Sequence, residues 1–173
     1  MKIYLNKFIL VIAFLNCTAL EAQQVPEPQK LKQFSFMIGE WQGNGTYYSS
    51  QGESEIEVHE SVVFAADSTI LLIHGKGRDS DGKIHHDAIG VIYTENGQTH
   101  VHAFTMQGQN VIADVNKNGE KSFDWGFDLP NGGKIKYSAT FTETTWEESG
   151  TYTTPDGNQS FPTVKMSLKK SGR

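Results

Sequence analysis

Residues 36–45 read FMIGEWQGNG, and this stretch decides how the rest of the chain is interpreted. The segment Lys30–Ile38 (KLKQFSFMI) has apolar residues at helical spacing and stops at Gly39, which predicts one short N-terminal helix. From Trp41 onward the period changes, because large apolar side chains alternate with polar ones. The stretch therefore predicts a helix that ends in a glycine and leads directly into a β-strand.

The remaining sequence repeats this strand pattern, with Gly, Asn or Asp clusters about every ten residues. It predicts about ten strands, at Trp41–Ser49, Ser54–Phe64, Ser68–Gly77, Lys83–Tyr93, Gln98–Met106, Asn110–Asn116, Lys121–Asp128, Lys134–Thr142, Thr145–Thr153 and Ser160–Lys169. Short turns such as Glu95-Asn96-Gly97 join antiparallel neighbours. A meander of this length exposes two edges unless it closes. We predict an all-β fold, an antiparallel up-and-down barrel with a lipocalin-sized interior.

Trp41 has a particular place in such a barrel. In an extended strand it shares one face with Gly43 and Gly45, and then with Tyr47. A large ring at the floor of a barrel needs neighbours without side chains, and glycines also let the strand bend. We expect Trp41 to be a buried plug and not a ligand contact.

The motif Gly39–Gly45 (GEWQGNG) resembles the start of nitrobindin-like and other lipocalin-like (calycin) barrels. His86–Tyr93 (HDAIGVIY) and Met166–Lys170 (MSLKK) resemble a secreted bacterial branch of that group. The resemblance implies one calycin-like domain over residues 30–173. Nitrobindin-like barrels bind haem through a histidine close to the C-terminus, but this chain has no histidine after His102. Haem would need a different ligand here, so we expect no resident cofactor.

The first 22 residues predict a signal peptide. Lys2 and Lys7 precede the apolar run Phe8–Leu15 (FILVIAFL). This run is shorter than the roughly 20 residues that a membrane-spanning helix needs. Cleavage after Ala22 would leave residues 23–29 (QQVPEPQ) as a linker, a mature chain without a transmembrane segment, and a periplasmic or secreted protein. A lipid anchor at Cys17 is the disfavoured alternative, because the preceding residue, Asn16, is not small.

Composition excludes several classes of protein. The formal net charge is −5 and there is no basic run, which argues against nucleic acid and anionic membranes as partners. Cys17 is the only cysteine, so its removal with the signal would exclude disulfides. No nucleophile elbow, zinc-protease signature, phosphate loop or dinucleotide fingerprint is present. Oligomeric state has no signature in the sequence.

The histidines offer a possible metal site. His100 and His102 lie on the same face of one strand and could bind zinc or copper, with His85 or Asp87 of the preceding strand as a third ligand. Alternatively, both histidines point outward and are solvated, and the residues between them face in. Phe104 shares their face and favours an inward orientation. We favour solvated or cavity-lining histidines and expect no bound metal.

Two apolar faces suggest where the interior lies. Aromatic alternation over residues 121–128 and 134–142 predicts a wall that includes Trp125 and Tyr137. Glu148 lies among rings on the next strand, where a buried carboxylate needs a partner or a proton, although an outward Glu148 is an alternative. Residues 70–73 are apolar on both faces, so either the N-terminal helix or a neighbouring loop covers the outer face, or that face is an exposed patch for a partner. We favour cover by the N-terminal helix.

These observations favour a non-enzymatic binder of a small, largely apolar molecule. The predicted ligand-binding residues are Tyr47, His74, His100, His102, Phe104, Trp125, Tyr137 and Glu148. One alternative is a cofactor-free isomerase or cyclase that uses Glu148, Tyr137 or His74 as acid or base. The other alternative is haem or metal binding through His74, His100 or His102.

Overall fold

The computed structural model describes residues 30–172, and the predicted signal peptide (1–22) and linker (23–29) lie outside the described residues. Two short 3₁₀ helices and ten strands make up the fold. They are η1 (Lys32–Met37), β1 (Gly39–Ser49), β2 (Gly52–Ala65), η2 (Ala66–Ser68), β3 (Ile70–Arg78), β4 (Ile84–Glu95), β5 (Gln98–Thr105), β6 (Asn110–Gly119), β7 (Ser122–Asp128), β8 (Lys134–Phe141), β9 (Thr145–Thr153) and β10 (Ser160–Ser171).

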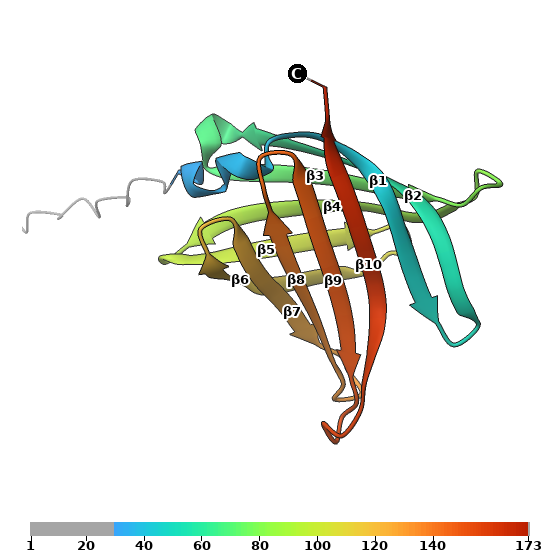
Figure 1. The fold of residues 1–173 in the computed structure, drawn as a ribbon. Coiled ribbons are helices and arrows are strands. Elements are labelled where there is room, and N and C mark those ends of the chain that lie inside the picture. The colour runs from blue at the N-terminus through green and yellow to red at the C-terminus, as the bar shows by residue number, and fades with distance from the viewer. Residues whose placement is uncertain (1–29, 173) are drawn as a thin grey trace, which may run out of the picture.

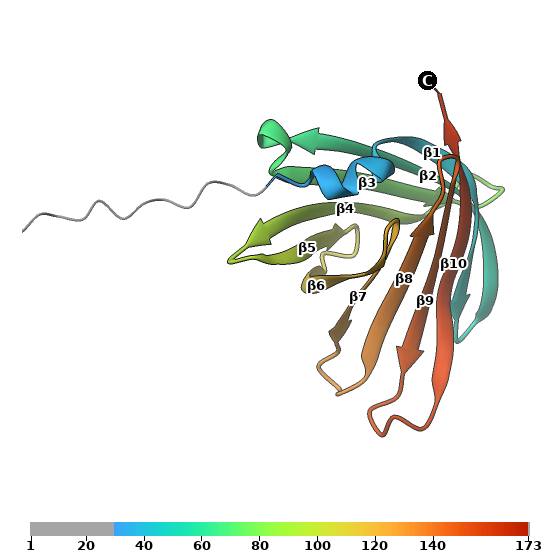
Figure 2. The ribbon, with the colours of Figure 1, turned by 60° about the vertical axis from the view of Figure 1, so that its left-hand side comes forward.

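The ten strands form one closed antiparallel barrel. Each strand pairs with its neighbour in sequence, and β1 pairs with β10 to complete the ring. Gly43 lies opposite Leu168 and Tyr47 lies opposite Val164 across this closing pair. Strands β3–β6 cross β7–β10 at a large angle, as Figures 1 and 2 show. The prediction of an all-β up-and-down barrel of ten strands is confirmed.

The turn between β4 and β5 follows its predicted chemistry. Asn96 and Gly97 have positive φ values of 51° and 83°, as a two-residue type I′ hairpin requires. Glycine and asparagine adopt this left-handed conformation at the lowest steric cost. Glu95 and Gln98 are therefore the last pair of the ladder.

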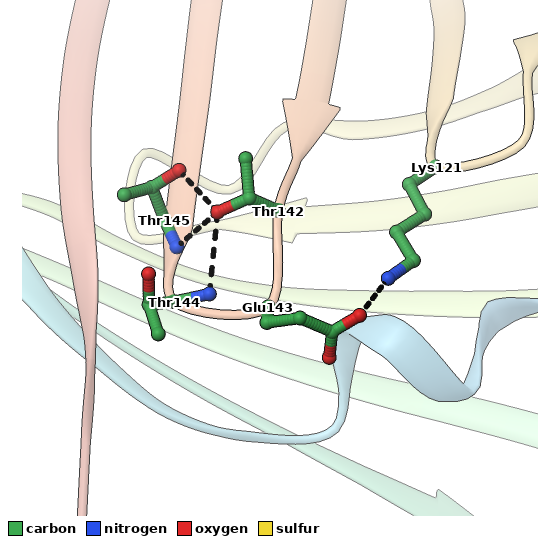
Figure 3. Close-up of polar contacts among 5 residues, drawn as sticks. All are labelled: Lys121, Thr142, Glu143, Thr144 and Thr145. Atoms are coloured by element: carbon green, nitrogen blue, oxygen red, sulfur yellow. Dashed lines mark hydrogen bonds and ion pairs between the residues drawn. The ribbon is translucent and has the colours of Figure 1, made fainter.

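The turn between β8 and β9 contains neither Gly nor Pro. A threonine hydroxyl organises it: the Thr142 Oγ1 accepts hydrogen bonds from the backbone N–H groups of Thr144 at 3.2 Å and Thr145 at 2.9 Å (Figure 3). Lys121, at the start of the neighbouring β7, forms an ion pair with Glu143 at the tip of the turn. Side-chain oxygens thus stabilise this turn, where hairpins such as the one between β4 and β5 use a glycine.

The predicted N-terminal α-helix is wrong, because the segment forms the 3₁₀ helix η1. Its buried side chains, Leu31, Phe34 and Met37, are three residues apart, and three residues per turn places all of them on one face. Ile38 already has extended φ and ψ. Figure 1 shows η1 beside the connection from β2 to β3, to which the Leu31 N–H donates a hydrogen bond at the Ser68 carbonyl. In the described part of the chain, no helix is long and apolar enough to span a membrane.

Trp41 closes the end of the barrel next to η1. Its side chain is fully buried, and its indole Nε1 donates a 2.8 Å hydrogen bond to the Met37 carbonyl. The Trp41 ring packs edge-on against Phe141 and Trp146, with centroids 5.7 and 6.0 Å away. The expectation that Trp41 is a buried plug is confirmed.

The outer face of β3 is not covered by η1, so that expectation is wrong. The apolar side chains of η1 turn into the barrel end, where Phe34 packs edge-on against Phe123. Outside the barrel, Val63 lies opposite Leu72 and is 48% exposed, and Ile112 is 57% exposed. Apolar side chains on the outer surface of β2 and β6 therefore face solvent, while Ile70 and Leu72 of β3 are half-buried.

Candidate functional site

The barrel encloses a cavity of about 240 Å³. Most of its wall is apolar and includes Ile56, Val58, Ile92, Val101, Phe123 and Met166. A smaller polar set faces the same space: Tyr47, Glu60, His86, Thr105, Gln109, Tyr137, Glu148 and Thr163. An apolar wall with a few convergent polar groups is the usual composition of a small-molecule site.

Glycines on the inner faces make room for the larger polar side chains. A Cβ added at Gly75 would lie 2.3 Å from the Glu60 Oε1, and one at Gly150 would lie 2.7 Å from the Tyr137 ring. Either approach is closer than packed atoms allow. Glycine within these strands therefore seats the Glu60 carboxyl and the Tyr137 ring.

Glu60 is the buried carboxyl of β2, and its residue is only 6% exposed. Its neighbours along the inner face are Val58 and Val62, which are both buried and apolar. Burial raises the pKa of Glu60 to about 8, and the charge of Glu148 contributes to the rise. No hydrogen bond within residues 30–172 offsets this effect. Near neutral pH, the Glu60 carboxyl therefore holds a proton.

Glu148 is the corresponding carboxyl of β9. Its Oε2 accepts a 3.1 Å hydrogen bond from the indole Nε1 of Trp146. Burial raises the pKa of Glu148 to about 7, although the indole groups of Trp146 and Trp125 partly offset the rise. The residue is half-buried because its side chain also faces the cavity. Glu148 is thus poised between its two protonation states at neutral pH.

Tyr47 of β1 and His86 of β4 form a polar pair in the cavity wall. The Tyr47 hydroxyl lies 2.9 Å from the His86 Nδ1, where either group can be the donor. Burial lowers the pKa of His86, so its imidazole is neutral at pH 7. Burial also raises the pKa of Tyr47, and the charges of Tyr137, Glu60 and Glu148 raise it further. The pair therefore contributes no net charge.

Trp125 and Tyr137 lie opposite each other on β7 and β8 and form a flat aromatic wall. Their rings stack with centroids 4.2 Å apart and planes 15° from parallel. Burial and the nearby Glu148 raise the pKa of Tyr137 to about 12, which leaves its hydroxyl protonated. The stacked rings offer an apolar surface beside a carboxyl.

Two threonine hydroxyls in the cavity wall have no partner among the described residues. They are the Oγ1 atoms of Thr105 and Thr163, and both are buried. Buried hydroxyls are almost always hydrogen-bonded to protein or water. Within residues 30–172, both hydroxyls are therefore unpaired polar groups in the wall of the barrel.

The structure brings half of the predicted ligand-binding residues together. Tyr47, Trp125, Tyr137 and Glu148 come from β1, β7, β8 and β9, and all line the cavity. Glu148 faces inward, which excludes the alternative in which it points outward. Two of the three predicted acid–base candidates, Glu148 and Tyr137, thus share one site.

The other four predicted residues lie on the outer face, so their inward placement is wrong. His74 is exposed and bonds through Nε2 to Asp87 at 2.9 Å, and the His100 Nδ1 lies 2.9 Å from the Asp114 Oδ1. His102 stacks on Phe104 with centroids 4.1 Å apart, and Phe104 is 43% exposed. These strands turn their alternate, smaller residues inward, such as Gly75, Val101 and Ala103.

Glu60 and His86 are the site residues that the sequence interpretation missed. Glu60 had a detectable signal, because it occupies an apolar position in the alternation Ile56, Val58, Glu60, Val62. A carboxyl at such a position must face the interior if the strand stays regular. The sequence correctly predicts that His85 and His86 point to opposite faces of their strand. It does not indicate that the face with His86 is the interior one.

The three histidines that were predicted as haem or metal ligands do not line the cavity. His74, His100 and His102, the three candidate ligands, all lie outside the lining. His86 is the histidine of residues 30–172 that lines the cavity, and its Nδ1 is bonded to Tyr47. Nowhere in residues 30–172 do three His, Cys, Asp or Glu side chains converge as metal ligands would.

The closed ten-strand barrel defines a calycin-like fold, and two solved structures share it. One is Rv2717c from M. tuberculosis, with 14% sequence identity and a TM-score of 0.66 over 82% of this chain and 97% of that chain. The other is the S-type phycobiliprotein lyase CPES from Guillardia theta, with 9% identity and a TM-score of 0.60 over 84% and 94% of the two chains. No protein-family model and no curated protein matches the sequence. At these identities the similarity concerns the fold alone.

Proposed function

We propose that this protein is an exported binder that holds one small, largely apolar molecule inside its barrel. Residues 1–22 would direct its export to the periplasm or the exterior. The cavity wall would supply affinity through apolar contact, and the polar set would orient the ligand. In this proposal the protein carries or sequesters its ligand without changing it.

One observation carries the proposal: the cavity is apolar over most of its wall, yet contains polar groups without partners. A core built only for stability excludes unpaired hydroxyls and carboxyls, because each costs free energy. The hydroxyls of Thr105 and Thr163 and the carboxyl of Glu60 are such groups among the described residues. Inward Gly90 keeps space open that a side chain would fill.

Native mass spectrometry tests the proposal directly. Protein purified from its own host is expected to carry a mass above that of the polypeptide, which is lost on denaturation. Protein with no added mass that also fails to take up a neutral apolar dye such as Nile red would contradict the proposal. Export is tested separately, by locating the protein in the host and sequencing its N-terminus.

A matched pair of variants links binding to the cavity. Gly90 lines the cavity, and a Cβ there would lie 3.6 Å or more from its neighbours, so Gly90→Leu adds bulk to the cavity without a forced clash at the Cβ. Thr140→Leu adds a similar apolar side chain at an exposed position of β8. Gly90→Leu is expected to reduce dye binding about tenfold or more, and Thr140→Leu is expected to leave it unchanged.

A second candidate function is acid–base catalysis in the same cavity. It is favoured by the two carboxyls, Glu60 and Glu148, whose pKa values lie near neutrality, where an acid or a base is most effective. The protein named as a lyase provides a precedent for an enzyme on this fold. If the isolated ligand returns chemically unchanged after prolonged incubation with fresh protein, catalysis is contradicted and binding is retained.

A further inference from the structure

We infer that the molecule bound in the cavity is an organic cation, an aromatic or aliphatic amine whose ammonium group lies between the Glu60 and Glu148 carboxyls. This inference rests on the proposed function, because it concerns the same cavity. It adds the chemical class of the ligand, which the apolar wall alone does not indicate.

The first argument is the absence of a balancing positive charge. No lysine or arginine of residues 30–172 lines the cavity. The ion pairs formed by the described residues use other acidic side chains, such as Asp67, Asp87 and Asp114, and none includes Glu60 or Glu148. Buried charges in proteins are otherwise paired with an opposite charge. Without such a partner the two carboxyls hold protons near neutral pH, and a cation from outside the chain would supply the positive charge that lets them ionise.

The second argument comes from the groups that surround the two carboxyls. Tyr47, Tyr137 and His86 are the other titratable groups of the cavity wall. Burial keeps the two tyrosines protonated and the imidazole neutral at pH 7, so none of them supplies a positive charge. Glu60 and Glu148 also repel each other when both are ionised. A cation between them would attract both carboxylates and offset their repulsion, so the proton that the pair holds would be released.

The third argument is hydrogen-bonding capacity. An ammonium group donates three hydrogen bonds. The Glu60 carboxyl receives none from the described residues, and the Thr105 and Thr163 hydroxyls have no partner there either. The stacked Trp125 and Tyr137 rings offer an apolar face for the rest of the ligand. The site thus pairs acceptors for a charged head with a flat wall for an apolar body.

A pair of probes of nearly equal shape tests the inference. Tryptamine carries a primary amine, and tryptophol carries a hydroxyl in its place. Isothermal titration calorimetry in two buffers of different ionisation enthalpy is expected to show about tenfold tighter binding of tryptamine near neutral pH. Tryptamine binding is expected to release protons to the buffer, and tryptophol binding is not.

Glu60→Gln is the decisive variant, because glutamine has the shape of the protonated carboxyl and preserves packing beside Gly75. It is expected to remove the preference for tryptamine and to leave tryptophol binding intact. Glu148→Gln is expected to act in the same direction. Circular dichroism and Nile red uptake confirm that each variant retains its fold and its cavity.

The outcomes separate this inference from the proposed function. Equal binding of both probes, or tighter binding of tryptophol, overturns the cation and leaves the binder intact. Nile red uptake without binding of either probe also overturns the cation. Failure of Nile red and of both probes overturns the proposed function itself. A tryptamine preference that survives both Glu60→Gln and Glu148→Gln overturns the assignment to these carboxyls.

Discussion

The Glu60 carboxyl lies directly above Gly75 of the neighbouring strand: a Cβ added at Gly75 would lie 2.3 Å from the Glu60 Oε1 and 2.5 Å from its Oε2. The two residues are opposite each other in the ladder between β2 and β3. A glycine on β3 therefore determines where a carboxyl of β2 lies inside the barrel. This contact links the stability of the wall to the chemistry of the cavity.

Gly75→Ala is expected to destabilise the protein by up to about 1 kcal/mol, because the new methyl group overlaps the Glu60 carboxyl and forces this flexible end of the side chain to move. Urea denaturation measures the change in the free energy of unfolding. The double variant Gly75→Ala/Glu60→Ala has no overlap, so it is expected to lose less free energy of unfolding than the two single variants lose together. Gly90→Ala is the matched control, since its Cβ would make only ordinary contacts, and it is expected to be neutral or stabilising.

Stability is expected to fall as the pH rises from about 6.5 to 8. Glu60 and Glu148 have a pKa of 4.5 when unfolded, and burial raises it to about 8 and about 7 in the folded protein. The unfolded chain thus binds fewer protons in this range. The stability associated with the neutral carboxyls is complete below pH 4.5 and is lost as the pH rises through the folded pKa values. The slope is at most about 1.4 kcal/mol per pH unit for each group.

Glu60→Gln provides the control for this pH dependence, since its side chain does not titrate. Urea denaturation across the same range is expected to give a flatter profile for the variant. His86 acts in the opposite direction: its lowered pKa makes stability increase with pH, an effect that is complete above the ordinary histidine pKa of 6.5. An identical slope in Glu60→Gln and the parent protein would show that Glu60 ionises freely in the folded state.

Trp41→Phe is expected to reduce stability by about 1–3 kcal/mol. The substitution leaves the Met37 carbonyl without its indole donor and opens space beside Phe141 and Trp146 at the closed end. Lys170→Met is a useful comparison, because it removes only the ammonium group that lies 4.9 Å from the Trp41 ring centroid. That change is expected to cost less than about 1 kcal/mol. If the two variants lost similar amounts of stability, the buried indole of Trp41 would contribute little more than the contact between its ring and the Lys170 ammonium group.

Ala66→Gly is expected to stabilise the protein by up to about 1 kcal/mol. Ala66 has a φ of 46° in the connection between β2 and β3, a left-handed conformation that disfavours side chains other than that of glycine. The neighbouring Ala65 has an extended φ of −131°, so Ala65→Gly is expected to be destabilising. Thermal denaturation of the two variants shows whether the signs differ. A lower melting temperature for Ala66→Gly would argue against stored strain.

Strand positions could be predicted because their signals are local. Alternation and turn residues act within a few positions of each other, and Asn96-Gly97 places its hairpin without reference to the rest of the chain. The turn at Thr142–Thr145 shows the opposite case, since threonine hydroxyls replace the usual glycine. Only the strands on either side of it indicate where it lies. The N-terminal segment has apolar residues that suit two helix types, and packing into the barrel end selects the 3₁₀ form.

The direction in which each side chain points was harder to predict. Both faces of β5 carry apolar residues, so alternation alone does not distinguish Val101 and Ala103 from His102 and Phe104. The choice depends on neighbouring strands and on the space inside a narrow barrel, which small side chains suit better. Glu60 was missed for a related reason. It lies between the polar residues His59 and Ser61, although Glu60 falls on the apolar parity.

The pairing of β1 with β10 also has a consequence during biosynthesis. Glu40 lies opposite Ser171, so the first and last strands of the described chain complete each other. A ribosome releases β1 long before β10, and the ring cannot close until the final strand emerges. Until then the nascent sheet presents two open edges, which invite pairing with other chains. Truncation before β10 would therefore be expected to yield an aggregating protein rather than a smaller barrel.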